Sequence, residues 1–224
     1  MEKKYKLTEE TININGRTLY RIEALKDFND VKKGDKGGYV EDEENLSQRC
    51  NCWVYGNAMV CDDARVYGDA VVCDKAEVYH YAEVYGNAKI YGNAKICGDA
   101  VIFDSAQVYG DAVVYEYTMV FGNSRVYGNA KICGDAMVYG NAEVYDKAIV
   151  CGDAMVYGYA EVYGSAEVYG SAEVFSKAKV FDNAEVYDEA KVFEDARIYG
   201  NAKICGMAWV FDNAQVHGNT VVCG

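Results

Sequence analysis

The sequence predicts an all-β chain in which residues 48–224 form a single-stranded parallel β-helix, triangular in section, with three hexads per coil and about nine coils. Three observations lead to this prediction. A six-residue pattern runs without interruption from Val54 to the last residue, proline is absent, and two residue types recur at multiples of eighteen residues. Because proline is common in the loops of globular domains, its absence indicates few ordinary loops.

The hexad reads V-Y-G-N-A-x, and each of its positions has a structural meaning. Position 1 is Val or Ile in all twenty-nine hexads, and position 5 is Ala in twenty-five of twenty-eight. Side chains alternate along a strand, so positions 5 and 1 point inward while positions 6 and 2 point outward. Gly, Asn and Asp in positions 3 and 4 tolerate positive φ and turn the corner. Stacked coils therefore bury a continuous column of Val and Ala.

The number of hexads in one coil follows from the outward residues in position 2. All the position-2 cysteines except Cys73 are separated by multiples of eighteen residues, and so are all the repeat phenylalanines except Phe181. Two residue types that agree on one period predict that every third hexad lies on the same face. The cysteines on this lattice are Cys61, Cys97, Cys133, Cys151, Cys205 and Cys223, and the phenylalanines are Phe103, Phe121, Phe175, Phe193 and Phe211.

Residues 1–47 are predicted to be a small N-terminal cap. Asn15-Gly16 separates two alternating runs, which is a strong β-hairpin signal. The segment 33–38, Lys-Gly-Asp-Lys-Gly-Gly, is expected to be a loop. It lacks the Gly-Lys-Ser/Thr ending of a phosphate-binding loop and a following helix, so we expect no nucleotide site there. The cap would cover the open strand edges of the first coil.

The hexads resemble the hexapeptide-repeat family of left-handed β-helices, in which an aliphatic residue is followed four positions later by a small one. This resemblance implies left-handed coils and side-by-side association. The chain departs from that family in position 2, where it has aromatic residues. Asp27-Phe28-Asn29-Asp30-Val31-Lys32, Gly37-Gly38-Tyr39-Val40, Asn45-Leu46-Ser47-Gln48 and Cys52-Trp53-Val54-Tyr55 are similar to the N-terminal segment of uncharacterised bacterial β-helix proteins assigned as transferases. V-Y-G-N-A repeats also resemble phage and prophage proteins.

Composition limits the environment and the partners of the chain. The start has no apolar core for a signal peptide, and no apolar run is long enough to span a membrane. We therefore expect a cytoplasmic protein with reduced thiols. The formal net charge is −13. This charge argues against direct nucleic-acid binding.

The two histidines are the only candidates for a catalytic base. Hexapeptide acyltransferases, which the hexads resemble, need a histidine to deprotonate the acceptor. His80 occupies a corner between two tyrosines, and His217 replaces an aromatic in position 2. Both are weak candidates, because an exposed tolerated substitution explains each of them equally well. Two histidines cannot supply the three metal ligands of a γ-class carbonic anhydrase.

No cofactor and no metal site is predicted. Cys50, Cys52 and Cys61 do not match a zinc spacing, and the corner aspartates are expected to be turn formers. Cys133 over Cys151, and Cys205 over Cys223, lie one coil apart. Parallel side chains disfavour a disulfide, which requires crossed geometry, so we expect free thiols at these four positions.

One outward face loses its charges over four consecutive coils and predicts an interface. A strip of Met, Val, Phe and Tyr bounded by charged coils is typical of a contact surface. An open C-terminal coil that exposes core valines predicts a second contact, C-terminus to C-terminus. The predicted interface residues are Val101, Phe103, Met119, Phe121, Met137, Tyr139, Met155, Tyr157, Trp209, Phe211 and Val222.

Three functions remain open on the sequence. The first is a non-catalytic, homo-oligomeric scaffold or binding protein of phage origin that acts through its surfaces. The second is a hexapeptide-type acyltransferase with its site between subunits. The third is an acidic rod that mimics DNA and occupies a host protein. Acetyl-CoA binding separates the first two, and capture from host lysate at high salt separates the first from the third.

Overall fold

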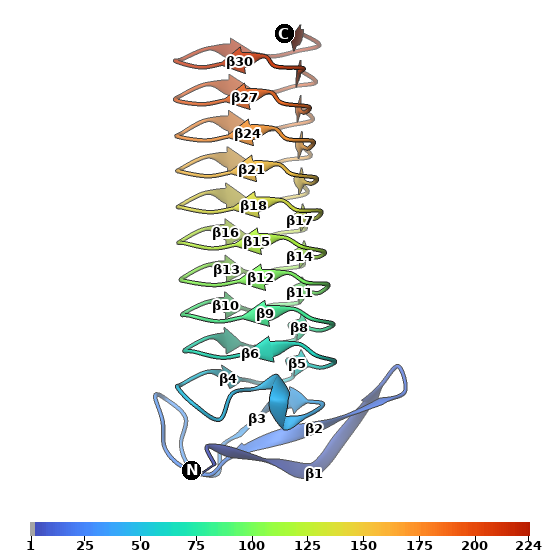
Figure 1. The fold of residues 1–224 in the computed structure, drawn as a ribbon, viewed down its shortest axis with the longest axis vertical. Coiled ribbons are helices and arrows are strands. Elements are labelled where there is room, and N and C mark those ends of the chain that lie inside the picture. The colour runs from blue at the N-terminus through green and yellow to red at the C-terminus, as the bar shows by residue number, and fades with distance from the viewer. Residues whose placement is uncertain (1–2) are drawn as a thin grey trace.

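The computed structural model describes residues 3–224 and shows a straight rod of stacked coils on an N-terminal cap (Figure 1). Each coil contributes one short strand to each of three parallel sheets, and strands eighteen residues apart pair in register, as Met119 with Met137. The predicted three hexads per coil are therefore confirmed. In the solenoid the outward residue in position 6 starts each strand, and the inward Val or Ile in position 1 follows it and ends all strands except β29 and β32, which continue to a cysteine in position 2.

The three sheets are named here by their number of strands, and the bounds of their elements follow. The thirteen-stranded sheet contains β1 Tyr5–Ile14, β2 Arg17–Ala24, β3 Lys36–Val40, β5 Met59–Val60, β8 Glu77–Val78, β11 Lys95–Ile96, β14 Val113–Val114, β17 Lys131–Ile132, β20 Ile149–Val150, β23 Glu167–Val168, β26 Glu185–Val186, β29 Lys203–Cys205 and β32 Val221–Cys223. The ten-stranded sheet contains β4 Trp53–Val54, β7 Val71–Val72, β10 Lys89–Ile90, β13 Gln107–Val108, β16 Arg125–Val126, β19 Glu143–Val144, β22 Glu161–Val162, β25 Lys179–Val180, β28 Arg197–Ile198 and β31 Gln215–Val216. The nine-stranded sheet contains β6 Arg65–Val66, β9 Glu83–Val84, β12 Val101–Ile102, β15 Met119–Val120, β18 Met137–Val138, β21 Met155–Val156, β24 Glu173–Val174, β27 Lys191–Val192 and β30 Trp209–Val210.

The core is the predicted column of small and β-branched side chains. Alanines in position 5 and the Val or Ile in position 1 have no exposed area from Val54 to Ile204, apart from Val66 at 1%. Thr118 and Ser124, which replace alanine in this column, are also buried, and each hydroxyl donates to a backbone carbonyl three residues earlier. The interior is therefore filled by side chains, and nothing in it is shaped to hold a ligand.

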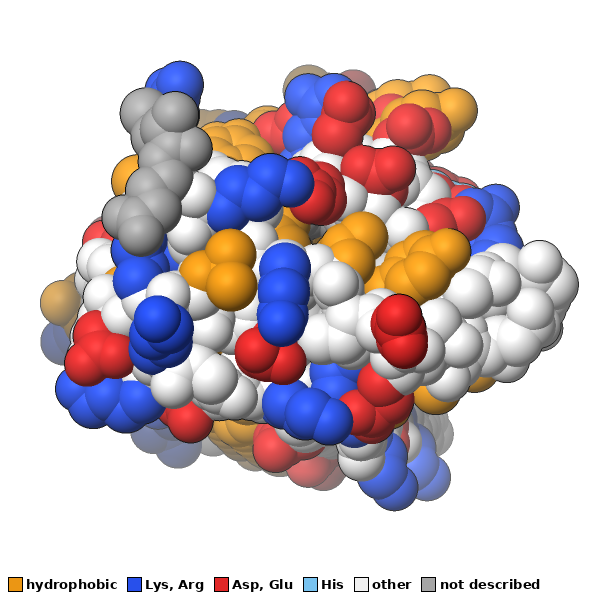
Figure 2. Space-filling model, turned by 90° about the horizontal axis from the view of Figure 1, so that it is seen from below, with side chains coloured by type: hydrophobic (Ala, Val, Ile, Leu, Met, Phe, Trp, Pro, Cys, Tyr) orange, Lys and Arg blue, Asp and Glu red, His pale blue; other side chains and the backbone are white. Residues whose placement is uncertain are grey.

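The cap consists of the β1–β2 hairpin, strand β3 and the 3₁₀ turn η1, Glu43–Asn45. The hairpin turn lies at Asn15 and Gly16, both with positive φ, as the sequence predicts. Strand β3 pairs antiparallel with β2 and parallel with β5, so it joins the cap to the solenoid. Seen from the cap end, charged side chains of both signs cover the molecule and separate small hydrophobic clusters (Figure 2).

The expectation that residues 33–38 form a loop is wrong for the last three of them. Lys36, Gly37 and Gly38 belong to β3. A Cβ atom on Gly37 would lie 2.5 Å from the carbonyl oxygen of Val54, and one on Gly38 would lie 2.5 Å from that of Ala58. The two glycines are therefore required because the cap strand runs directly against the first coil.

Two side chains close the base of the rod. Trp53 is 1% exposed and packs edge-on against Phe28, with ring centroids 5.3 Å apart. Lys4 is buried, and its ammonium donates to the carbonyl of Cys52 at 2.8 Å. Burial lowers the pKa of Lys4. No helix among residues 3–224 is long and apolar enough to cross a membrane.

Candidate docking face and hairpin cleft

The uncharged strip predicted from the sequence lies on the outer side of the nine-stranded sheet. We call its four rows the methionine face, which consists of Val101/Phe103, Met119/Phe121, Met137/Tyr139 and Met155/Tyr157. All eight side chains are half-buried, so each already packs against its neighbours and still presents area to a partner. The rows lie in register, because Met119, Met137 and Met155 occupy equivalent positions on adjacent paired strands. The structure therefore brings these predicted residues together.

Charged rows border the methionine face on both sides, and hydrogen bonds hold their carboxylates. Below the face, Tyr67 donates to Glu83 at 2.8 Å. Above it, Glu173 accepts from Tyr157 at 2.8 Å and from Lys191 at 2.6 Å. These contacts fix the carboxylates along the sheet surface and give the apolar strip a sharp boundary on each side.

The remaining predicted interface residues lie at the last coil, away from the methionine face. Trp209 is 61% exposed and Phe211 is 45% exposed. Trp209 also makes an edge-on contact with Phe193 at 6.1 Å. Val222 is half-buried on the thirteen-stranded sheet, a different side of the rod. The predicted set is therefore two surfaces, a continuous strip and an exposed apolar end.

Stacked aromatic ladders run along two of the three faces. On the nine-stranded sheet, rings from Tyr67 to Phe193 are almost parallel, with centroids 4.7–5.2 Å apart. A second ladder from Tyr91 to His217 follows the ten-stranded sheet. Because each ring covers the faces of its neighbours, only ring edges and hydroxyls point to solvent. The inner rings of the ladders therefore present no free ring face on which a planar ligand or a sugar could stack.

Burial and carboxylate acceptors suppress the ionisation of Tyr127 and Tyr157 in the ladders and of Tyr169 on the thirteen-stranded sheet. Burial raises the pKa of Tyr127 and Tyr157, and hydrogen bonds to Glu143 and Glu173 raise it further. The same causes, with Glu185 as acceptor, raise the pKa of Tyr169 to about 12. The hydroxyls therefore act as neutral donors to these glutamates at ordinary pH.

The corner acids act as acceptors for the backbone, in agreement with the prediction that they are turn formers. Asp74, for example, has φ of 63° and accepts from the amide of Gly92 at 2.9 Å. Asp146 has φ of 58° and accepts from the amide of Gly164 at 3.2 Å. Each carboxylate thus ties its own corner to the next one along the rod. Among residues 3–224 no group of three or more His, Cys, Asp or Glu side chains is placed to hold a metal ion.

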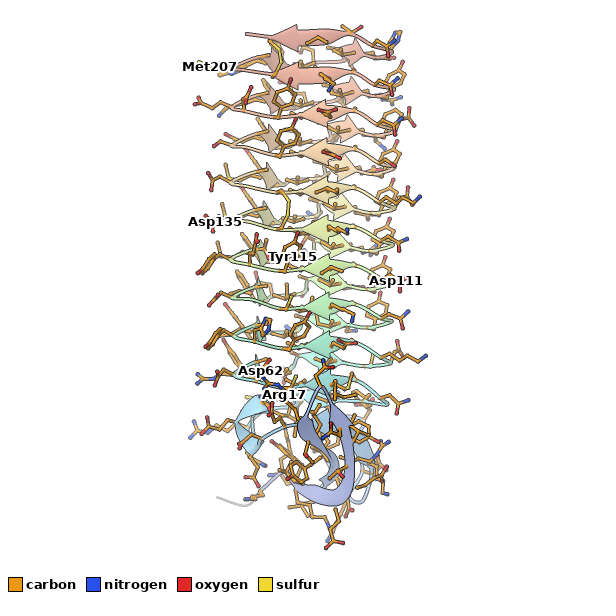
Figure 3. All side chains as sticks on the ribbon, turned by 90° about the vertical axis from the view of Figure 1, so that its right-hand side faces the viewer. Arg17, Asp62, Asp111, Tyr115, Asp135 and Met207 are labelled. Atoms are coloured by element: carbon orange, nitrogen blue, oxygen red, sulfur yellow. A yellow bond between two sulfur atoms is a disulfide. The ribbon has the colours of Figure 1, made fainter. Side chains whose placement is uncertain are left out.

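His80 lies in a cleft that the sequence did not predict. The β1–β2 hairpin leans over the thirteen-stranded sheet and encloses a hollow of about 300 Å³. Figure 3 shows Arg17 of the hairpin beside Asp62, which lies at the corner between β5 and β6. These two side chains form an ion pair. The amide of His80 donates to Asp62 at 3.0 Å, while its exposed ring lies edge-on to Tyr79. The cleft is lined by Ile14, Asn15, Arg17, Leu19, Met59, Cys61, Asp62, Glu77, Tyr79, His80 and Lys95.

The charges in the hairpin cleft are paired within the chain. Arg17 bonds to Glu41 as well as to Asp62, and Lys95 bonds to Glu77 at 3.1 Å. Burial, followed by the charge of Asp62, raises the pKa of Cys61 to about 11. Cys61 is therefore a neutral thiol and a poor nucleophile. His217, the other candidate base, is exposed on the far coil, where it stacks on Tyr199.

The expectation of free thiols is wrong at the two pairs that lie one coil apart. The structure links Cys133 to Cys151 and Cys205 to Cys223 by disulfides. Their Cα atoms are 4.6 and 4.5 Å apart, within the range that a disulfide can bridge, because stacked coils hold equivalent positions at strand spacing. Cys50, Cys52, Cys61, Cys73 and Cys97 are free.

Comparison with known proteins agrees with this architecture. Residues 60–74, 106–122 and 130–146 match the family model described as YdcK Beta solenoid repeat. Over 55 residues the chain is 38% identical to a protein of Escherichia coli strain K12 named Uncharacterized acetyltransferase YdcK. The match covers 21% of this chain and 17% of that protein, so it spans about a sixth of the relative's length. The chain thus carries β-solenoid repeats similar to those of an acetyltransferase-named protein.

Proposed function

We propose that the protein is a rigid β-solenoid scaffold that associates with a second copy of itself through the nine-stranded sheet. The observation that supports this proposal is the methionine face, where four adjacent rows lack charge and are bordered by charged rows. Methionine is flexible and polarizable, and it is common on surfaces that bind other proteins. On the other two sheets, charged position-6 residues such as Lys131 and Glu143 interrupt the apolar rows, so neither has four consecutive uncharged rows.

The size of the contact can be estimated from strand geometry. Four rows at ~4.8 Å spacing and a strand width of ~13 Å give roughly 250 Å² per partner. Specific interfaces bury at least about 1,000 Å² in total, so these four rows alone are too small. All nine rows of the sheet give roughly 560 Å² per partner, which reaches that limit. A stable dimer therefore requires contact along the whole sheet.

Sedimentation of the full chain over a range of concentrations tests the proposal. We expect a dimer for the native sequence and a monomer for Met137→Lys, because the substitution places a charge at the centre of the apolar strip. Ile149→Lys is the matched control, since Ile149 is also a half-buried residue in position 6 but lies on the thirteen-stranded sheet. A native chain that stays monomeric at high concentration would refute the proposal.

Acetyl transfer in the hairpin cleft is a second candidate, favoured by the name of the relative and by the position of His80. In this reaction the His80 imidazole takes a proton from an acceptor hydroxyl or amine. The acyl group then moves from a thioester to the acceptor, and the thiol is released. Calorimetry with acetyl-CoA tests it. Binding that is lost in His80→Ala and kept in His217→Ala would support acetyl transfer, and no binding by the native chain would exclude it.

A further inference from the structure

We propose that the second copy docks antiparallel, with the two-fold axis lying along strand β18 at the level of Met137. This inference rests on the proposed function and specifies the geometry of the partner. A two-fold axis that lies in the interface and runs parallel to the strands makes the two rods antiparallel. It leaves the strand direction unchanged, so each hexad position lies opposite the same hexad position of the partner. Position 6 then faces position 6, and the rows are paired symmetrically around β18.

Full overlap of the two sheets selects this axis. Strand β18 is the fifth of the nine strands, with four strands on each side. An axis at β18 therefore pairs all nine rows, whereas an axis displaced by half a coil or more leaves at least one row uncovered. Met137 faces itself, and Met119 faces Met155. Because the area of nine rows only just reaches that of a specific interface, loss of rows weakens the contact.

The charges favour this axis over one displaced toward β15. With the axis at β18, Glu83 of one copy faces Lys191 of the other. Arg65 faces the exposed Trp209, a favourable pairing of a guanidinium with an aromatic ring. An axis midway between β15 and β18 would place Glu83 opposite Glu173 and Arg65 opposite Lys191, so like charges would meet twice. Juxtaposed like charges are strongly unfavourable in an interface.

A parallel dimer is disfavoured by the same charges. In that arrangement each coil meets the equivalent coil of the partner with its strand direction reversed, so position 6 faces position 2, and the two copies of Glu83 lie at one level, as do the two copies of Lys191. The antiparallel arrangement instead places Glu83 directly opposite Lys191, so opposite charges meet. Electrostatic complementarity thus favours the antiparallel direction, and full overlap of the nine rows sets the register.

One row pairs a charged residue with an apolar one, and the structure shows how this is tolerated. Val101 faces Glu173, whose carboxylate is already bonded to Lys191 and Tyr157 of its own chain. The Glu173 side chain is only 16% exposed. The Glu173 carboxylate is therefore already largely desolvated in the isolated chain, so docking adds little further desolvation free energy.

The flatness of the sheet allows contact over nine rows. The coils stack as straight columns with little twist (Figure 1). Successive rings from Phe103 to Phe193 are tilted by only 2–6° relative to each other. An ordinary twisted sheet would diverge from its partner within a few strands. Two untwisted faces keep opposite rows together along the whole length.

Distances between spin labels in the dimer test the geometry. Asn87, Asn141 and Asp195 are exposed at the same corner of three different coils. Asn141 lies beside the row of Met137, Asn87 lies three coils below it, and Asp195 lies three coils above it. Each is replaced in the full chain by a label-bearing non-natural residue. In the antiparallel dimer, the pair at Asn141 is close. Pairs at Asn87 and at Asp195 are equally distant and longer by ~15 Å or more, because six coil spacings separate them.

The outcomes distinguish the two proposals. Equal distances at all three positions show a parallel dimer and overturn the antiparallel geometry, while the scaffold proposal stands. The absence of any dipolar coupling shows a monomer and overturns both. A shortest distance at Asn87 or Asp195 shows a different axis and overturns the register.

Charge reversal gives a second test that does not use labels. We expect Glu83→Lys and Lys191→Glu each to weaken dimerisation about tenfold or more, and the double variant to restore it. In a parallel dimer the single changes leave the repulsion as it was, so unchanged affinity in both would overturn the proposal. Circular dichroism of each variant checks that the solenoid remains folded.

Discussion

The smallest unit that determines this fold is the corner residue in position 3. Most corners have glycine, whose positive φ carries no side-chain penalty. Where the corner has Asp or Glu, except at Asp212 in the last coil, the carboxylate accepts the backbone amide eighteen residues later, as Asp146 does from Gly164. The hydrogen bond compensates for the unfavourable backbone conformation. The sequence predicts these residues as turn formers, but the bond between coils becomes visible only with the stacking.

Substitution of Asp146 separates the two contributions. Asp146→Ala removes the acceptor and leaves a side chain at φ of 58°, so we expect a loss of about 1–2 kcal/mol in the free energy of unfolding. Asp146→Asn keeps an acceptor and should stay near the native stability. Asp146→Gly loses the bond but relieves the backbone and should be milder than alanine. Denaturant unfolding measures all three, and an alanine variant as stable as asparagine would contradict the assignment.

At the scale of a single element, the aromatic ladders add cohesion that the hexad core does not provide. Tyr127 stacks on Tyr109 and on Tyr145 at 4.8 and 4.9 Å. Tyr115 occupies the same hexad position on the thirteen-stranded sheet, where the equivalent residues one coil away are Cys97 and Cys133. Tyr127 and Tyr115 therefore form a matched pair, in which Tyr127 is stacked between two rings and Tyr115 has no ring above or below it in its column.

We expect Tyr127→Ala to destabilise the solenoid by about 1–3 kcal/mol more than Tyr115→Ala, because each aromatic stack contributes about 0.5–1.5 kcal/mol beyond buried area. Thermal or denaturant unfolding of both variants measures the difference. Equal losses would show that the ladder rings contribute only through the area they bury.

Alkaline titration reports on the same element. Burial in the folded chain raises the pKa of ladder tyrosines such as Tyr127, and it raises the pKa of Tyr169, on the thirteen-stranded sheet, to about 12, above the ordinary value near 10. A raised pKa means that folding favours the neutral phenol. This contribution to stability is complete below about pH 10 and is lost as the pH rises through the folded pKa. Phenolate absorbance of the folded chain should therefore appear at higher pH than in denaturant, and coincident curves would contradict the burial of the hydroxyls.

The junction between the cap and the solenoid belongs to the scale of the whole molecule. Gly38 in β3 leaves no room for a side chain, because its Cβ would lie 2.6 Å from Cγ1 of Val54. We expect Gly38→Ala to separate the cap from the first coil and to increase hydrogen exchange in β2 and β3, while the middle coils stay protected. Thr18→Ala, an exposed change in the same cap, is the control. Unchanged protection of β2 in Gly38→Ala would show that the junction can adapt.

Much of the molecule could be predicted from the sequence because most of its contacts repeat. Each hexad specifies the same strand and corner, so the column of Val and Ala, the coil period and the rows of the methionine face follow from position alone. The hairpin follows from Asn15-Gly16. The cleft around His80 does not, because it depends on where the hairpin lies in the assembled molecule, with β2 paired to β3 and Arg17 in contact with Asp62. The strand at Gly37 and Gly38 was missed for the same reason, since close approach is a property of the assembled molecule.

The eighteen-residue circuit also determines how such a rod can change its length. Removal of a whole circuit shortens the molecule and leaves every column above the cut aligned with the column below it. Removal of one hexad would instead rotate everything above the cut by a third of a turn, so that glutamates and lysines of another side would continue the line of methionines. The core would remain intact in both cases, but only the first chain would keep an unbroken surface to offer a partner.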